Sequence, residues 1–491
     1  MNRPLRRVAL ACMVLFGLLL ANVNWVQVVK ADAYRDDPRN SRVLLRTYER
    51  ERGPIAVLAS DGRREAIAES VRTEGPLTWL RQYPGGPAYS HVSGYYSLVY
   101  GRTGVERSED RVLSGEDDRL FVRRLSDYIT GNAPKGGTVV LTLNPRAQQA
   151  AYDAMQGKRG AVVALDPRTG AVLAMVSLPS YDPSKLSSFE PAEIREYYAS
   201  LNDDSGDPLL NRAISKTYPP GSTFKVITAA AALASGEVNP ETRIPSPKEL
   251  DLPLTTANLR NFGGGSCGGE TITLADALRI SCNTAFGSLG LQLGGDALRE
   301  QAEKFGFGDN DLRVPTSVAD SRFPDDTNEP QAAQSAIGQF DVRATPLQMA
   351  MVAAGIANGG DVMRPYLVGE VQSPDLSVLE QPEPDVLSRA VSTDVAAELT
   401  RMMELVVADG SGRRAQIPGV RVAGKTGTAQ HAQGRPPHAW FIGFAPADDP
   451  QVAVAVVVED GGNLGSEATG GALSAPVAAA VMRAIIEGGS R

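Results

Sequence analysis

The 491-residue sequence is poor in cysteine and lysine and has no excess of basic charge. Three cysteines are too few for a disulfide-held scaffold, and no Cys-x-x-Cys pair indicates structural zinc. Only nine of the 49 basic residues are lysine, so a lysine inside a motif is less often there by chance. The formal charge of −8 lacks the basic excess of a nucleic-acid-binding protein, so we expect no nucleic-acid partner.

An apolar run from Val8 to Val29 follows three arginines near the N-terminus. A run of this length can span a bilayer, and the preceding arginines favour a cytoplasmic N-terminus. A cleaved signal peptide is the alternative, although Lys30 and Asp32 make a poor cleavage region. We expect a cytoplasmic tail at residues 1–7 and a single-pass anchor at 8–29, with the rest of this cell-membrane protein outside the cytoplasm.

The chain beyond the anchor divides into two regions of different character. Residues 31–145 are rich in Arg, Asp and Glu, with short strand-like pieces at Ile55–Leu58 and Thr138–Leu143, which predicts an extended module with a modest core. Residues 146–491 carry two predicted hairpins, at Gly160–Val176 and Trp440–Val458, and helical stretches between them. Strands at both ends with helices between favour an α+β layered domain.

The strongest local motif is Ser222-Thr-Phe-Lys225, directly after a Pro-Pro-Gly turn. Ala-rich sequence follows, so we expect a helix that begins at Ser222 and has free N–H groups at its start. Ser222 and Lys225 then share one helix face. A serine nucleophile needs a base, and lysine serves only if burial or a second cation lowers its pKa from about 10.4. The motif alone also arises by chance.

Two later motifs complete a set. Ser281-Cys-Asn283 lies in the turn after a helical-looking segment and offers a hydroxyl for proton relay and an amide for a substrate carbonyl. Lys425-Thr-Gly-Thr428 follows a β-like run. Its glycine lets substrate lie close to the strand edge, and its lysine is the second cation that would lower the pKa of Lys225. The ordered triplet strongly favours serine acyl transfer.

The chain resembles the class B penicillin-binding proteins, the serine D,D-transpeptidases of peptidoglycan, and among them an actinobacterial subgroup linked to cell division. The likeness covers nearly the whole chain. Outside the triplet it includes Asn211–Ala213, Ile337–Gln339, Ala344–Ala350, Ile356–Gly360 and Ala439–Pro446, and upstream Tyr96–Glu106 and Leu113–Gly115.

The resemblance implies a serine penicillin-recognising transpeptidase fold, which is α+β with an antiparallel sheet flanked by helices and an all-helical subregion. Residues 31–145 would form a non-catalytic pedestal or dimerisation-like module, and 146–491 the penicillin-binding transpeptidase domain. A cysteine at the middle of Ser281-Cys-Asn283 departs from the usual pattern, though both functional side chains remain.

The resemblance also implies catalytic roles. Ser222 would attack the penultimate D-Ala carbonyl of a stem peptide and release the terminal D-Ala. Lys225 would take the serine proton, and Ser281 with Lys425 would carry it to the leaving amine. A second stem peptide's amine would then resolve the acyl-enzyme.

The remaining roles concern binding. Backbone N–H groups of Ser222 and Thr428 would form the oxyanion hole, with Gly427 between the two threonines of the strand. The hydroxyls of Thr426 and Thr428 would hold the substrate carboxylate, and Asn283 its amide.

The implied partners are stem peptides ending in D-Ala-D-Ala, β-lactams, and glycosyltransferase or division proteins of the membrane, with no metal or cofactor. A D,D-carboxypeptidase or serine β-lactamase on the same fold is one alternative, against which the anchor and upstream module count. A catalytically silent division scaffold is another, which the intact triplet disfavours.

Two further features allow competing interpretations. Gly419–Thr426 satisfies the P-loop pattern, but the residues between its glycines are β-like and no helix start follows to bind phosphate, so we reject it. Cys267 and Cys282 are either two free thiols or a disulfide that would tie a glycine-rich loop to the residue beside Asn283.

Overall fold

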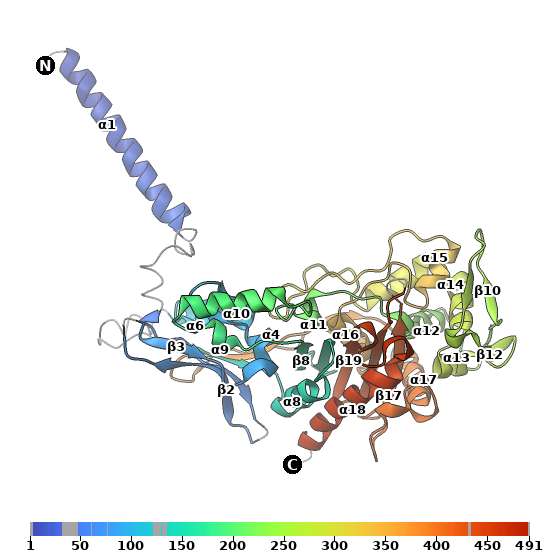
Figure 1. Cartoon of the computed structure of the whole chain (residues 1–491). Helices are drawn as coiled ribbons and strands as arrows, with labels where there is room; N and C mark the ends of the chain where they lie inside the picture. Colours follow the sequence, from blue (N-terminus) through green and yellow to red (C-terminus); the bar gives the residue numbers. More distant parts are fainter. Residues whose placement is uncertain are drawn as a thin grey trace.

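A long N-terminal helix, a six-stranded sheet and a five-stranded sheet follow one another along the molecule (Figure 1). The computed structural model describes residues 3–31, 48–59, 61–75, 77–120, 129, 135–430 and 434–489. Helix α1 (Arg3–Asn24) continues as a π-helical turn (Trp25–Val29), projects away from the body and buries none of its side chains there. Among the described residues, Arg3–Val29 and Gly470–Gly488 are long and apolar enough to cross a membrane, but more than half of the second is buried inside the protein.

The six-stranded sheet forms the N-terminal module and has the order β15-β14-β6-β1-β2-β3. Four of its strands come from the module itself, namely β1 (Ile55–Leu58), β2 (Arg64–Arg72), β3 (Trp79–Gln82) and β6 (Thr138–Leu141). The other two, β14 (Val368–Gln372) and β15 (Val378–Glu380), come from far beyond residue 146. Strand β14 pairs antiparallel with β6, so the chain returns to complete this sheet.

The five-stranded antiparallel sheet has the order β17-β18-β19-β7-β8 and carries the predicted hairpins. They are β7 (Gly160–Leu165) with β8 (Val172–Leu178), and β18 (His438–Ala445) with β19 (Val452–Val458). Along β19, Ala453, Ala455 and Val457 face one core, while the residues between them face another. The sheet is thus covered on both faces, which explains why this antiparallel strand is a continuous apolar run.

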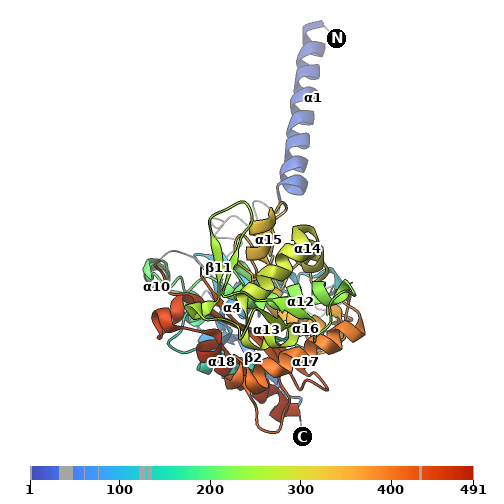
Figure 2. The same ribbon diagram turned by 90° about the vertical axis from the view of Figure 1, so that its right-hand side faces the viewer.

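Helices on both sides enclose this sheet. Helices α8 (Pro145–Ala154) and α18 (Gly470–Gly489) cover one face, and α16 (Pro346–Ala357) covers the other. An all-helical region follows, with α12 (Lys225–Ala234), α13 (Leu274–Ile280), α14 (Asn283–Lys304), α15 (Glu329–Ser335) and α17 (Thr393–Asp409). Figure 2 looks onto this region, which lies at the end of the molecule opposite the N-terminal module. The predicted α+β layered fold with a helical subregion is confirmed.

Candidate active site

The serine of the first motif lies on a short turn that precedes a helix. Gly221–Thr223 form one 3-10 turn, and α12 begins only at Lys225. The helix expected to begin at Ser222 therefore starts there as a 3-10 turn and becomes α-helical at Lys225. Gly221, just before Ser222, has a φ of +54°, a left-handed conformation that glycine adopts without steric cost. Ser222 is half-buried on this turn, ahead of a helix that is buried almost throughout.

Neighbouring segments hold the nucleophile turn in place. The Gly221 N–H donates to Gly338 O at 2.9 Å, and the indole Nε1–H of Trp440 donates to Pro219 O at 3.1 Å. Gly338 belongs to the Ile-Gly-Gln segment and Trp440 to β18. The turn is thus held by two backbone groups that directly precede Ser222, and neither contact involves the serine side chain.

Lys225 is fully buried, and its ammonium group reaches the second motif. Its Nζ donates to Ser281 O at 2.8 Å and to Asn283 Oδ1 at 2.7 Å, and lies 3.3 Å from Ser281 Oγ. Burial, followed by the positive charge of Lys425, holds the pKa of Lys225 well below its usual range. A lowered pKa favours the neutral form of the lysine, which is the form that accepts a proton.

Ser281 occupies the left-handed residue that ends α13. It has φ +65° and ψ +43°, which is uncommon for a residue other than glycine. This conformation ends the helix, and the Ser281 hydroxyl lies between the two lysines of the motifs. Lys425 Nζ donates to Ser281 Oγ at 2.8 Å and to Thr426 O at 2.9 Å. Burial lowers the pKa of Lys425 to about 7.

The third motif lies within β17 (Ala423–Ala429), the edge strand of the five-stranded sheet. An extended strand here is incompatible with a phosphate-binding loop, as the sequence indicated. Gly427 faces the nucleophile turn so closely that a Cβ there would come within 3.0 Å of Pro220 O and Thr223 Cγ2. The turn also lies against Thr428, because a Cβ on Gly221 would be 2.9 Å from Thr428 O. The structure therefore brings all three motifs together.

A serine that the sequence did not single out joins this group. Ser411 Oγ lies 2.6 Å from Thr426 Oγ1, within hydrogen-bond distance. It belongs to the short connection between α17 and β17, between two glycines. A Gly-Ser-Gly sequence directly after a helix is a weak signal, and only the fold shows that the Ser411 hydroxyl meets Thr426.

The predicted segment around Tyr218 is fixed by a buried carboxylate that the sequence also did not reveal. Glu459, at the end of β19, accepts from Tyr218 Oη–H at 2.7 Å, from Lys216 Nζ at 2.9 Å and from Arg212 Nε at 3.0 Å. Arg159 pairs with its other oxygen at 2.6 Å. Burial would raise the pKa of Glu459, but the hydrogen bonds from Tyr218 and Lys216 and the charge of Arg212 outweigh it, and that pKa is about 2.

The second motif is also bonded to the glycine-rich loop. The structure joins Cys267 to Cys282 by a disulfide, with 6.0 Å between the Cα atoms. Cys282 is therefore tied to the loop while its neighbours Ser281 and Asn283 face the lysines. The third cysteine, Cys12, is free and lies in α1.

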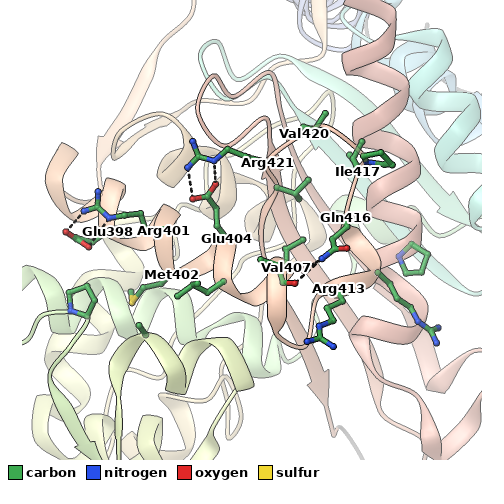
Figure 3. A pocket seen from close by; sticks show the side chains of 18 of the residues that line it. Glu398, Arg401, Met402, Glu404, Val407, Arg413, Gln416, Ile417, Val420 and Arg421 are labelled. Atoms are coloured by element: carbon green, nitrogen blue, oxygen red, sulfur yellow. Dashed lines mark hydrogen bonds and ion pairs between the residues drawn. The ribbon is translucent and has the colours of Figure 1, made fainter.

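A cavity of about 1290 Å³ lies elsewhere in the protein. It lies between α17 and the segment 413–422 that leads to β17, and none of the catalytic motif residues lines it. Figure 3 shows Glu404 paired with Arg421, and Glu398 with Arg401, beside apolar side chains such as Met402. Among the described residues, no group of three or more His, Cys, Asp or Glu side chains is placed to hold a metal ion.

Two protein families match separate parts of the chain. The penicillin-binding protein transpeptidase domain matches residues 160–483, and the penicillin-binding protein A dimerisation domain matches residues 52–139. The peptidoglycan D,D-transpeptidase PbpA of Mycolicibacterium smegmatis is 51% identical over the full length of both chains. Its counterpart in Mycobacterium tuberculosis is 48% identical and aligns with 99% of this chain and 100% of its own.

Solved structures of penicillin-binding proteins also superpose on this chain. The ceftriaxone acyl-enzyme complex of penicillin-binding protein A from M. tuberculosis superposes with a TM-score of 0.86 at 47% identity, covering 90% of this chain and 100% of that one. Penicillin-binding protein 2 of Pseudomonas aeruginosa superposes with a TM-score of 0.72 at 31% identity, covering 89% and 95%. The chain therefore belongs to the class B penicillin-binding proteins and is a serine-type D,D-transpeptidase of that family.

Proposed function

We propose that this protein cross-links peptidoglycan stem peptides through an acyl-enzyme on Ser222, and that β-lactams acylate the same hydroxyl. The observation that carries the proposal is that two buried lysines meet at one hydroxyl, with Ser281 Oγ 3.3 Å from Lys225 Nζ and 2.8 Å from Lys425 Nζ. Relatives of known structure are named as acyl-enzyme complexes of ceftriaxone and imipenem, which supports the same chemistry here.

In the acylation step, neutral Lys225 takes the proton of Ser222 as the hydroxyl attacks the penultimate D-Ala carbonyl. Backbone N–H groups of Ser222 and Thr428 stabilise the oxyanion, each such donor contributing roughly 3 kcal/mol. The proton then passes through Ser281 and Lys425 to the leaving amine of the terminal D-Ala. This route is consistent with the low pKa values of both lysines.

Substrate binding falls to the β17 edge and the second motif. Thr426 and Thr428 bind the terminal carboxylate, and Asn283 binds a peptide amide. Because β17 is the outer strand of its sheet, its free edge is available to an extended peptide. In the second half-reaction, the amine of another stem peptide attacks the acyl-enzyme and forms the cross-link.

Helix α1 anchors the enzyme in the cell membrane, with residues 1–7 inside and the catalytic domain outside. The exposure of its apolar side chains supports this placement. Residues 31–145 serve as a non-catalytic pedestal, and the enzyme works beside a membrane glycosyltransferase in cell division. The likeness of residues 52–139 to the penicillin-binding protein A dimerisation domain supports a role for this module in association.

Labelling with a fluorescent penicillin tests the acyl-enzyme. We expect the wild type to become covalently labelled and Ser222→Ala to remain unlabelled while retaining the wild-type unfolding temperature. If the wild type fails to label, or if Ser222→Ala labels equally, Ser222 is not the nucleophile. Release of D-Ala with and without an amine acceptor then separates two activities: a transpeptidase forms a new amide, whereas a carboxypeptidase releases D-Ala regardless of acceptor.

A further inference from the structure

The residue at the N-cap position of helix α14 does not cap the helix with its side chain. The cap residue is Cys282, whose side chain makes no capping hydrogen bond and is committed to the disulfide with Cys267. Ser, Thr, Asp or Asn usually accepts a hydrogen bond from the first free N–H groups of a helix. Because α14 begins at Asn283, the missing cap affects a residue of the active site directly.

Asn261, 21 positions upstream of Cys282, supplies the cap instead. Its Oδ1 accepts from the Asn283 N–H at 2.8 Å and from the Thr284 N–H at 3.1 Å. Its Nδ2 donates to Gly265 O at 3.1 Å and to Thr284 Oγ1 at 3.3 Å. Asn261 is half-buried, so water competes only in part for these bonds.

The backbone carbonyl of Arg260, next to Asn261, also fixes the side chain of Asn283. Arg260 O accepts from Asn283 Nδ2 at 2.9 Å, and this fixes which way the amide of Asn283 points. With its nitrogen bound to Arg260 O, the amide turns its oxygen to Lys225, where Oδ1 accepts from Nζ at 2.7 Å. Arg260 ends β11 (Asn258–Arg260), which forms a hairpin with β10 (Glu249–Asp251) beside α14 at the helical end of the molecule (Figure 2).

We propose that Asn261 is a positioning residue for acylation: it caps α14 in place of Cys282 and so holds Asn283 against Lys225. The disulfide occupies the side chain of Cys282 at the cap position of α14, and the loop that carries Cys267 also supplies the replacement cap, Asn261. The cysteine of the second motif and Asn261 therefore belong to one arrangement. The inference rests on the proposed acylation of Ser222.

Three variants separate positioning from simple folding. Asn261→Ala removes the cap, whereas Asn261→Asp keeps an oxygen that accepts from both N–H groups and is an equally good cap. Asn258→Ala is the matched control, because Asn258 lies on the same hairpin and its side chain donates only a long bond to Glu249, at 3.5 Å. Fluorescent-penicillin acylation is followed at increasing drug concentration, which yields a binding constant and a first-order acylation rate, together with the unfolding temperature.

We expect Asn261→Ala to lower the first-order acylation rate at least tenfold with less than a threefold change in the binding constant. Asn261→Asp should recover the rate to within threefold of wild type, and Asn258→Ala should match wild type. The proposal is overturned if Asn261→Ala acylates at the wild-type rate, or if Asp is as slow as Ala while both fold. A wild type that does not label would instead refute the acyl-enzyme itself, so the two failures are distinguishable.

Discussion

At the scale of single residues, the proposed active site contains two lysine amines that are buried away from water. Lys225 and Lys425 are both fully buried, and each carries a pKa below that of a lysine in water. Nine lysines in the whole chain made these two conspicuous in the sequence. The motif spacing predicted that one cation lowers the pKa of the other, and the structure agrees, although burial is the larger cause.

Lys425→Gln should move the pH dependence of acylation. The charge of Lys425 helps to keep the pKa of Lys225 low, so its loss raises that pKa. Since only neutral Lys225 accepts the serine proton, the acid limb of the residual acylation rate should move to higher pH. Single-turnover labelling between pH 5 and 9 measures it, and Lys425→Arg, which keeps the charge, is the control. An acid limb that stays in place in Lys425→Gln contradicts the electrostatic coupling.

Ser411→Ala tests a contact that only the structure revealed. If Ser411 orients the Thr426 hydroxyl for the substrate carboxylate, its loss should reduce the efficiency of β-lactam acylation roughly five- to tenfold, the equivalent of about 1 kcal/mol for one hydrogen bond. The loss should appear in the binding constant, because the carboxylate is bound before the chemistry. Ser411→Thr, which keeps the hydroxyl, should remain near wild type. Equal efficiency for Ser411→Ala and wild type would refute the role.

At the scale of elements, the sequence predicted a strand or a helix well where the pattern that identifies it lies within one segment. Ile55–Leu58 has the predicted bounds, because a β-run can be recognised within a few residues. Helix α16 is one of the helical stretches expected between the two hairpins. The helix expected at Ser222 starts there, but its first turn is 3-10 rather than α-helical. The cap of α14 could not be predicted, since its oxygen comes from another segment.

Glu459 binds four side chains, from Arg159, Arg212, Lys216 and Tyr218, so its ionisation should control acid stability. Its folded pKa of about 2 lies below the ordinary 4.5, so its stabilisation is complete above pH 4.5 and is lost as the pH falls toward 2. The difference corresponds to at most about 3 kcal/mol. We expect Glu459→Gln to unfold more readily at pH 7 and to lose less stability between pH 4.5 and 2 than wild type does.

Denaturant unfolding at a series of pH values measures this linkage. Glu467→Gln is the matched control, because Glu467 is an exposed glutamate on the same connection to α18. It should follow the wild-type curve throughout. If the free energy of unfolding falls equally with pH in Glu459→Gln and wild type, the Glu459 carboxylate is not the cause of the acid dependence.

At the scale of the whole molecule, the two modules share one sheet and one core. Strand β14 pairs with β6 from Thr138 to Leu141, and a single cluster of buried residues runs from Ile55 to Val457. Composition indicated a change of character near residue 145, but it carried no sign that residues 368–380 return to the first sheet. Short, partly polar strands such as β14 have little pattern of their own, and their partners are determined by the fold.

Removing the N-terminal module tests whether the catalytic domain depends on the shared sheet. A fragment of residues 146–491 lacks β6 and leaves β14 with an unpaired edge that invites aggregation. We expect it to be less soluble and to unfold at a lower temperature than a fragment of residues 48–491, which retains the sheet and lacks only the region of the proposed anchor. Both are compared by size-exclusion chromatography and thermal unfolding after expression under one condition. Equal yield and unfolding temperature would show that the catalytic domain is independent of β6.

The return of β14 also determines when the first module can be completed. About 230 residues separate the end of β6 from the start of β14, and the ribosome adds roughly 5 to 20 residues per second. The exposed edge of β6 therefore waits on the order of tens of seconds for its partner while the rest of the polypeptide is made. The N-terminal module is synthesised first, but its sheet is completed late, so the nascent chain depends on whatever shields the β6 edge until β14 has been made.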